Sequence, residues 1–91
     1  MTAKFPLGCV VATPGALRAI DSAGDTPQQF LDRHHRGDWG ELGEDDRREN
    51  ERSLKHGYRL LSAYRLRDGT KIWIITEADR SATTILLPEE Y

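Results

Sequence analysis

The chain has 91 residues, of which 37% are hydrophobic and 31% are charged, and its formal net charge is −2. This balance is typical of a folded protein, and the length accommodates one domain, residues 1–91. The near-neutral charge argues against a sequence-independent DNA-binding protein, which is normally basic overall.

A single cysteine, Cys9, excludes a disulfide framework and a cysteine-based zinc site, so we predict no metal and no cofactor. The N-terminus lacks the apolar core of a signal peptide, and no segment approaches the roughly 20 apolar residues of a membrane span. We therefore expect a cytoplasmic protein that makes no membrane contact.

The N-terminal half predicts a strand followed by helices. The apolar, β-branched run at 7–12 is typical of a strand. Thr13 and Thr26 each precede a proline, and this pair marks a helix N-cap followed by the first helical position. We therefore predict helices over 14–23 and 27–36. A third, very polar helix is predicted over 43–56, at the edge of the domain because its hydrophobic seam is weak.

The C-terminal part predicts antiparallel strands over 59–66, 71–77 and 83–87. Asp68-Gly69 lies between the first two and is typical of a two-residue hairpin turn. The fold class is therefore α+β. A short N-terminal strand and two to three helices pack on one face of a three- to four-stranded antiparallel meander.

The two-residue turn places Tyr64 opposite Trp73 and Arg65 opposite Ile72, and alternation then assigns two faces. The face predicted to pack on the helices carries Leu60, Tyr64, Leu66, Trp73 and Ile75. The other carries Leu61, Ala63, Ile72, Ile74 and Thr76 together with Arg59, Arg65 and Arg67. Because that second face mixes aliphatic and cationic side chains, we expect it to bind a partner. The predicted binding residues are Arg59, Leu61, Arg65, Arg67, Ile72, Ile74 and, from a loop, Trp39.

Three side chains have a structural and a functional interpretation. His34 shares the apolar helix face of Phe30 and Leu31, so we expect a buried histidine whose hydrogen bonds are satisfied. General acid–base work is the alternative. His34 and His35 point about 100° apart on a helix, which disfavours chelation of one metal. Trp39 is expected to anchor its loop on the core, with an exposed binding residue as the alternative.

Charge is segregated along the chain. Residues 38–51 hold seven acids and two bases, whereas residues 52–73 hold six bases and one acid. The two blocks can complement each other within one monomer. Alternatively, the basic strands bind nucleic acid through Arg59, Arg65, Arg67 and Lys71.

Several motifs together resemble a known group of proteins. They are Phe5-Pro6-Leu7-Gly8, Ala12-Thr13-Pro14-Gly15-Ala16-Leu17, His34-His35-Arg36-Gly37-Asp38-Trp39-Gly40, Asp68-Gly69-Thr70-Lys71-Ile72-Trp73 and the tail from Thr76 to Pro88. With these motifs the chain resembles small bacterial proteins carried near plasmids and other mobile elements. The resemblance implies an accessory role and no defined activity.

The layout of helices followed by an antiparallel meander also resembles the barnase-, EndoU- and RelE-like ribonucleases. That resemblance implies His34 or His35 as acid or base, Arg65 and Arg80 as phosphate clamps, and Thr83 or Thr84 as a positioning group. No motif assigns these roles, so a catalytic site stays unknown. Our leading hypothesis is a non-enzymatic protein that binds another protein or a second copy of itself. A metal-independent ribonuclease and a nucleic-acid-binding module are the alternatives.

Overall fold

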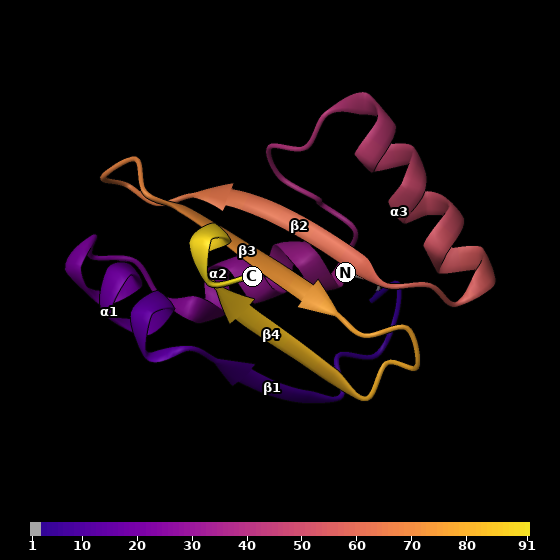
Figure 1. The fold of residues 1–91 in the computed structure, drawn as a ribbon, viewed down its shortest axis with the longest axis horizontal. Coiled ribbons are helices and arrows are strands. Elements are labelled where there is room, and N and C mark those ends of the chain that lie inside the picture. The colour runs from indigo at the N-terminus through magenta and orange to yellow at the C-terminus, as the bar shows by residue number, and fades with distance from the viewer. Residues whose placement is uncertain (1–2) are drawn as a thin grey trace.

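The computed structural model describes residues 3–91 (Figure 1). Its helices are α1 (Pro14–Ser22), α2 (Pro27–His35), α3 (Glu44–His56) and the short 3-10 helix η1 (Pro88–Glu90). Its strands are β1 (Cys9–Ala12), β2 (Leu60–Arg65), β3 (Lys71–Thr76) and β4 (Ala82–Leu86). No helix in the described part of the chain has both the length and the apolar character needed to cross a lipid bilayer.

The fold is α+β, as predicted. The four strands form one sheet in the order β1-β4-β3-β2. β2, β3 and β4 are the predicted antiparallel meander, and β1 joins its far edge parallel to β4. The sheet is therefore mixed. The chain passes through all three helices between β1 and β2 before it returns to the sheet.

The predicted hairpin register is wrong by one residue. The structure pairs Arg65 with Lys71, so that Tyr64 faces Ile72. The loop has three residues, 67–69, because the Leu66 N–H donates to the Thr70 carbonyl at 2.8 Å and Gly69 N–H donates to the Leu66 carbonyl at 2.9 Å. Gly69 has φ +91°, which is the left-handed residue that closes a three-residue hairpin loop.

This shift exchanges the inward and outward side chains of β3 relative to the prediction and leaves those of β2 as predicted. The inner face, which packs on the helices, carries Leu60, Ser62, Tyr64, Ile72, Ile74, Thr76, Thr83 and Ile85. The outer face carries Leu61, Ala63, Arg65, Lys71, Trp73, Ile75, Thr84 and Leu86. Ile72 and Ile74 are completely buried and are not part of an exposed binding face. The predicted inward positions of Trp73 and Ile75 are likewise wrong.

Two hydrophobic clusters hold the domain together. In the larger one, Ala16 and Ile20 of α1 and Phe30 and Leu31 of α2 pack on the inner face around Tyr64. The smaller cluster joins Phe5, Trp39 and Leu60. Trp39 is 2% exposed and its indole N–H donates to Glu51 Oε2 at 3.0 Å, so Trp39 anchors its loop and is not an exposed binding residue.

Candidate protein-interaction site

The β2 edge of the sheet is closed by the chain itself. Gly40 forms an isolated parallel bridge with Ala63, in which the Ala63 N–H donates to the Trp39 carbonyl at 3.1 Å. Asn50 of α3 covers the backbone of Leu61, the next outward position along β2. Its Nδ2 donates to the Leu61 carbonyl at 2.6 Å, and its Oδ1 accepts from the Leu61 N–H at 3.1 Å. The outward backbone groups of Leu61 and Ala63 therefore have partners.

The β1 edge is open. Cys9 N–H donates to the Ser81 carbonyl at 2.9 Å and Thr13 N–H donates to the Ile85 carbonyl at 3.0 Å, so odd-numbered residues bond to β4. Strand alternation then directs the N–H and C=O groups of Val10 and Ala12 away from the sheet. Within residues 3–91, β4 is the only strand that pairs with β1. Figure 1 shows no helix or strand beyond it.

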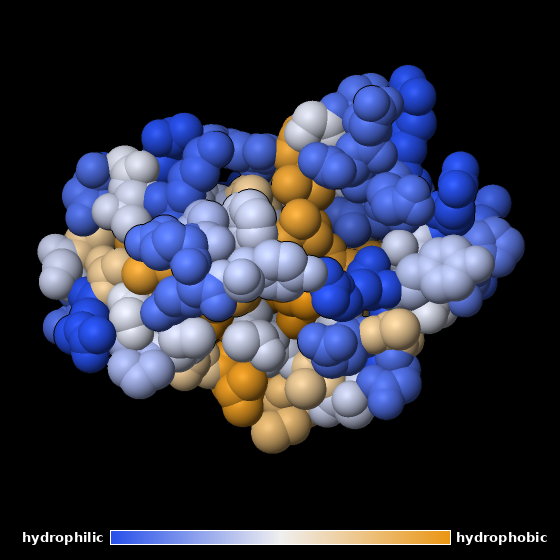
Figure 2. All heavy atoms as spheres, in the orientation of Figure 1, coloured by the Kyte–Doolittle hydropathy of each residue, from blue (hydrophilic) through white to orange (hydrophobic). Residues whose placement is uncertain are grey.

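The side chains of this edge are apolar. Val10 and Val11 are 43% and 46% exposed, and Cys9 is exposed beside them. Leu17, early in α1, is also 46% exposed. Figure 2 shows hydrophobic surface along this edge of the molecule. Protein edge strands normally carry lysine, proline or inward-pointing charges that prevent pairing with another chain, and Cys9–Ala12 carries none of these.

The outer face is less open than the sequence predicts. η1 and Tyr91 cover part of it, and the Tyr91 ring meets the Trp73 ring edge-on with centroids 5.8 Å apart. Arg59 hydrogen-bonds to the Tyr91 hydroxyl, and its guanidinium carbon lies 5.2 Å from the Tyr91 ring centre. Ile75 is consequently only 6% exposed. The apolar surface left on this face is small.

Two of the four cations predicted to bind nucleic acid are paired within the domain. Arg65 Nη2 lies 3.2 Å from Glu41 Oε1, and Arg67 Nε lies 3.1 Å from Asp25 Oδ1. The Arg65–Glu41 contact joins the basic block to the acidic block and favours the monomer interpretation of the segregated charge, whereas Asp25 lies outside the acidic block.

His34 is buried and fully hydrogen-bonded, as predicted. Its Nδ1 lies 2.5 Å from Ser62 Oγ, and its Nε2 lies 2.8 Å from Thr76 Oγ1. Thr76 Oγ1 lies 2.7 Å from Thr83 Oγ1, and the Thr83 hydroxyl donates to the Leu7 carbonyl at 2.7 Å. These contacts form a buried chain, here called the His34 chain, from β2 through α2 and β3 to β4.

The last acceptor of the His34 chain sets the direction of the bonds up to Nε2. A carbonyl oxygen has no proton, so Thr83 uses its only hydroxyl proton on Leu7. Thr76 must then donate to Thr83 and accept from His34 Nε2–H. Burial, together with the charges of His35 and Arg80, lowers the His34 pKa from 6.5 to about 3. The imidazole is therefore neutral at pH 7, and its Nδ1 accepts from Ser62.

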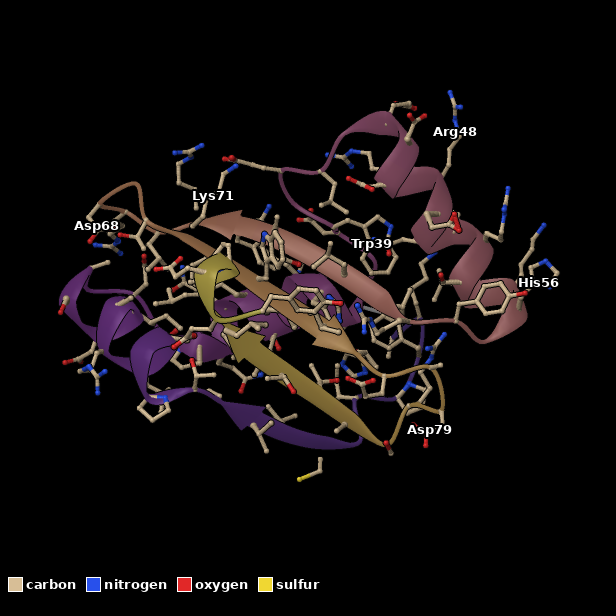
Figure 3. All side chains as sticks on the ribbon, viewed as in Figure 1. Trp39, Arg48, His56, Asp68, Lys71 and Asp79 are labelled. Atoms are coloured by element: carbon tan, nitrogen blue, oxygen red, sulfur yellow. The ribbon has the colours of Figure 1, made fainter. Side chains whose placement is uncertain are left out.

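The structure does not assemble the residues of a ribonuclease site. His34 has no free ring nitrogen and 0% exposure. Arg65 lies at the end of the sheet that carries Asp68 and Lys71, whereas Arg80 follows Asp79 at the other end (Figure 3). Thr83 is on the inner face and Thr84 on the outer face. His35 is only partly buried and lies against Phe5, with ring centroids 5.9 Å apart.

Arg80 instead has a structural role. It is the one non-glycine residue with a left-handed backbone among those described, with φ +62°. Its guanidinium donates to the carbonyls of Tyr58 at 2.6 Å, Ser53 at 3.0 Å and Glu77 at 3.1 Å. Arg80 thus ties the end of α3 to the β3–β4 turn, and both its Nη1 and its Nη2 donate to backbone carbonyls.

Sequence reasoning expected the interaction surface on one face of the sheet, whereas the open, apolar feature that the structure shows is the β1 edge. It assigned a strand to 7–12 but attached no function to it. Cys9–Ala12 carries no charge, but neither does Ala82–Leu86 of β4, so this pattern did not single out β1. Comparisons of the chain with protein-family models, curated proteins and solved structures found no match.

Proposed function

We propose that the domain is a non-enzymatic protein-interaction module whose docking element is the open edge of β1. The observation that supports this proposal is the contrast between the two sheet edges. The chain covers the β2 edge with Gly40 and Asn50, and it leaves the β1 edge both unpaired and apolar.

Strand addition is the binding mode that this edge supports. An extended segment of another protein would bond to the outward N–H and C=O groups of Val10 and Ala12. Its side chains would lie beside Val10 on one face and Val11 on the other, so uncharged and β-branched residues are favoured in the partner. The accessory role implied by the resemblance to mobile-element proteins is consistent with such a module, and it stays a proposal.

Val10 allows a selective test, because its N–H points outward and takes no part in the β1–β4 ladder. Val10→Pro removes this donor and leaves the internal hydrogen bonds in place, since proline is tolerated on edge strands. Val10→Thr keeps the N–H and the β-branched shape and is the matched control. Circular dichroism and a thermal melt would verify that both variants fold.

Random peptides displayed on phage would be selected on the wild-type domain, and the enriched peptides would be titrated against each variant. We expect extended, β-branched peptides that bind the wild type and Val10→Thr alike and bind Val10→Pro about tenfold more weakly. Peptides that bind Val10→Pro as tightly as the wild type would refute this use of the edge. Failure to enrich any peptide would also count against it.

A further inference from the structure

We infer that the occupant of the β1 edge is a second copy of this chain, paired antiparallel about a two-fold axis that passes beside Val11. The two four-stranded sheets would then form one continuous sheet across the interface. This inference rests on the proposed function, because it names the partner of the same edge.

The backbone allows one good register. An antiparallel pair needs outward N–H and C=O groups on both strands, and β1 offers these at Val10 and Ala12. Gly8 ends the strand on one side, because its φ of +67° is not extended. A side chain at Gly8 would also overlap the carbonyl oxygens of Arg80 and Ser81. Pro14 ends the strand on the other side, because it has no N–H.

Within these limits, each Val10 pairs with Ala12 of the other copy and exchanges two N–H···O bonds with it. The two-fold axis repeats this pair, giving four intermolecular hydrogen bonds. A register centred on Val10 would need Gly8 to pair with Ala12, and one centred on Ala12 would need Val10 to pair with Pro14. Both lose hydrogen bonds, so the register centred on Val11 is favoured.

The side chains are compatible with self-pairing. Two Val11 side chains would meet at the axis in a non-hydrogen-bonded pair, where neighbouring side chains are closest. Val10 would lie opposite Ala12 on the other face. Cys9–Ala12 carries no charge, so two copies meet without like-charge repulsion along the strand. Both valines would lose much of their present exposure.

Charges of both signs flank the strand at each end. The turn that contains Asp79 and Arg80 lies at the start of β1, because Cys9 pairs with Ala82. The other end carries Arg18 of α1 and Glu90, whose carboxylate accepts from the Thr13 hydroxyl at 2.7 Å. An antiparallel arrangement brings the start of one strand to the end of the other, so Asp79 of each copy would share an end of the interface with Arg18 of its partner, in a setting of balanced charge.

The expected dimer is weak, because a four-residue strand is short compared with the interfaces of obligate dimers. Light scattering coupled to size exclusion should show a mass that rises with concentration from one chain toward two. Val11→Lys places two ammonium groups opposite each other at the axis and should abolish this rise, whereas Arg48→Lys, on the exposed side of α3, should leave it unchanged.

Cysteine cross-linking tests the register itself. In a Cys9→Ser background, Val11→Cys should oxidise to a disulfide-linked dimer. Paired Cα atoms at non-hydrogen-bonded positions lie about 4.5 Å apart, within the disulfide range. Val10→Cys in the same background is the matched control. Its two Cα atoms would be about 8 Å apart, too far for a disulfide. The two natural Cys9 residues would lie about 13 Å apart along the strands and should not cross-link.

A one-chain mass at every concentration would overturn the inference. So would a dimer that persists in Val11→Lys, or cross-linking of Val10→Cys as efficient as that of Val11→Cys. The proposed function fails separately. If the chain is monomeric but peptides still bind in a manner sensitive to Val10→Pro, the edge is a docking site for other proteins and only the homodimer is refuted. If no peptide binds either, both proposals are refuted.

Discussion

Lowering the pH should destabilise the domain through His34. In the folded state the His34 pKa is lowered to about 3, chiefly by burial, whereas an unfolded chain has a histidine pKa of about 6.5. Between these values the unfolded state binds one more proton than the folded state. The stabilisation is therefore fully present above pH 6.5 and is lost as the pH falls toward 3.

The structure also sets the magnitude. Each pH unit within this window costs about 1.4 kcal/mol, so acidification from pH 7 to pH 5 crosses about 1.5 units of it and should lower the free energy of unfolding by about 2 kcal/mol. Stopping at pH 5 limits the loss of stability caused by protonation of carboxylates such as Asp38, whose pKa is lowered by the hydrogen bond from Arg33. Protonation of those groups takes place at lower pH.

Urea denaturation at pH 7, 6 and 5 measures the effect in the wild type and in His34→Gln. A glutamine amide can donate one hydrogen bond and accept another, as the neutral imidazole does, but it does not titrate. We expect the variant to be less stable at pH 7 and nearly flat down to pH 5, while the exposed His56→Gln control follows the wild type. Equal pH slopes for the wild type and His34→Gln would refute the reasoning.

Three further predictions concern the closed edge and the His34 chain, and denaturant unfolding measures each. Gly40→Ala should lower the free energy of unfolding by more than about 3 kcal/mol, because the added methyl overlaps the Ala63 carbonyl at a φ of +76°. Gly57→Ala, at φ +75° with open space around it, should lower it by only about 1 to 2 kcal/mol. Similar costs for the two would show that the edge contact is loose. Asn50→Leu should cost about 2 kcal/mol, because the N–H and C=O of Leu61 lose their partners. A neutral effect would mean that water replaces the amide. Thr83→Val should lower the free energy of unfolding by about 1 to 2 kcal/mol, because Thr76 and the Leu7 carbonyl lose a partner. An unchanged stability would show that these two bonds contribute nothing.

The local signals of the sequence were sufficient for the helix starts and for the fold class. Thr13 accepts from the Ala16 N–H at 3.0 Å and so caps α1, and Pro14 and Pro27 occupy first helical positions as predicted. These features depend on a few neighbouring residues. The burial of His34 was also predictable, because its spacing from Phe30 and Leu31 places all three on one helix face.

The face of β3 was not predictable from its pattern. Residues 72–75 form a continuous apolar run, so inward and outward assignments are equally compatible with alternation. Only the loop length separates them, and Arg67-Asp68-Gly69 is compatible with a two-residue turn at Asp68-Gly69 or with a three-residue loop closed by Gly69. The choice depends on hydrogen bonds of Leu66 and Thr70 that residue types do not specify. A slip of one residue then exchanges every side chain of the strand between the faces.

The candidate site depends on contacts between distant parts of the chain. Nothing in the residues near β1 shows that it is the outermost strand, because this follows from the order in which β4, β3 and β2 assemble. The cover on the β2 edge could not be predicted from the sequence for the same reason. Asn50 and Gly40 close that edge only after α3 and the preceding loop have packed beside it.

The His34 chain has a consequence for the motions of the N-terminal segment. Its last acceptor is Leu7, and Lys4 N–H donates to the His35 carbonyl at 2.9 Å. Residues near a chain terminus usually open independently and exchange their amide hydrogens within a short time. Here detachment of the segment as far as Leu7 also breaks its bond to Thr83 of β4, so we expect that larger opening to be coupled to the sheet and not independent of it.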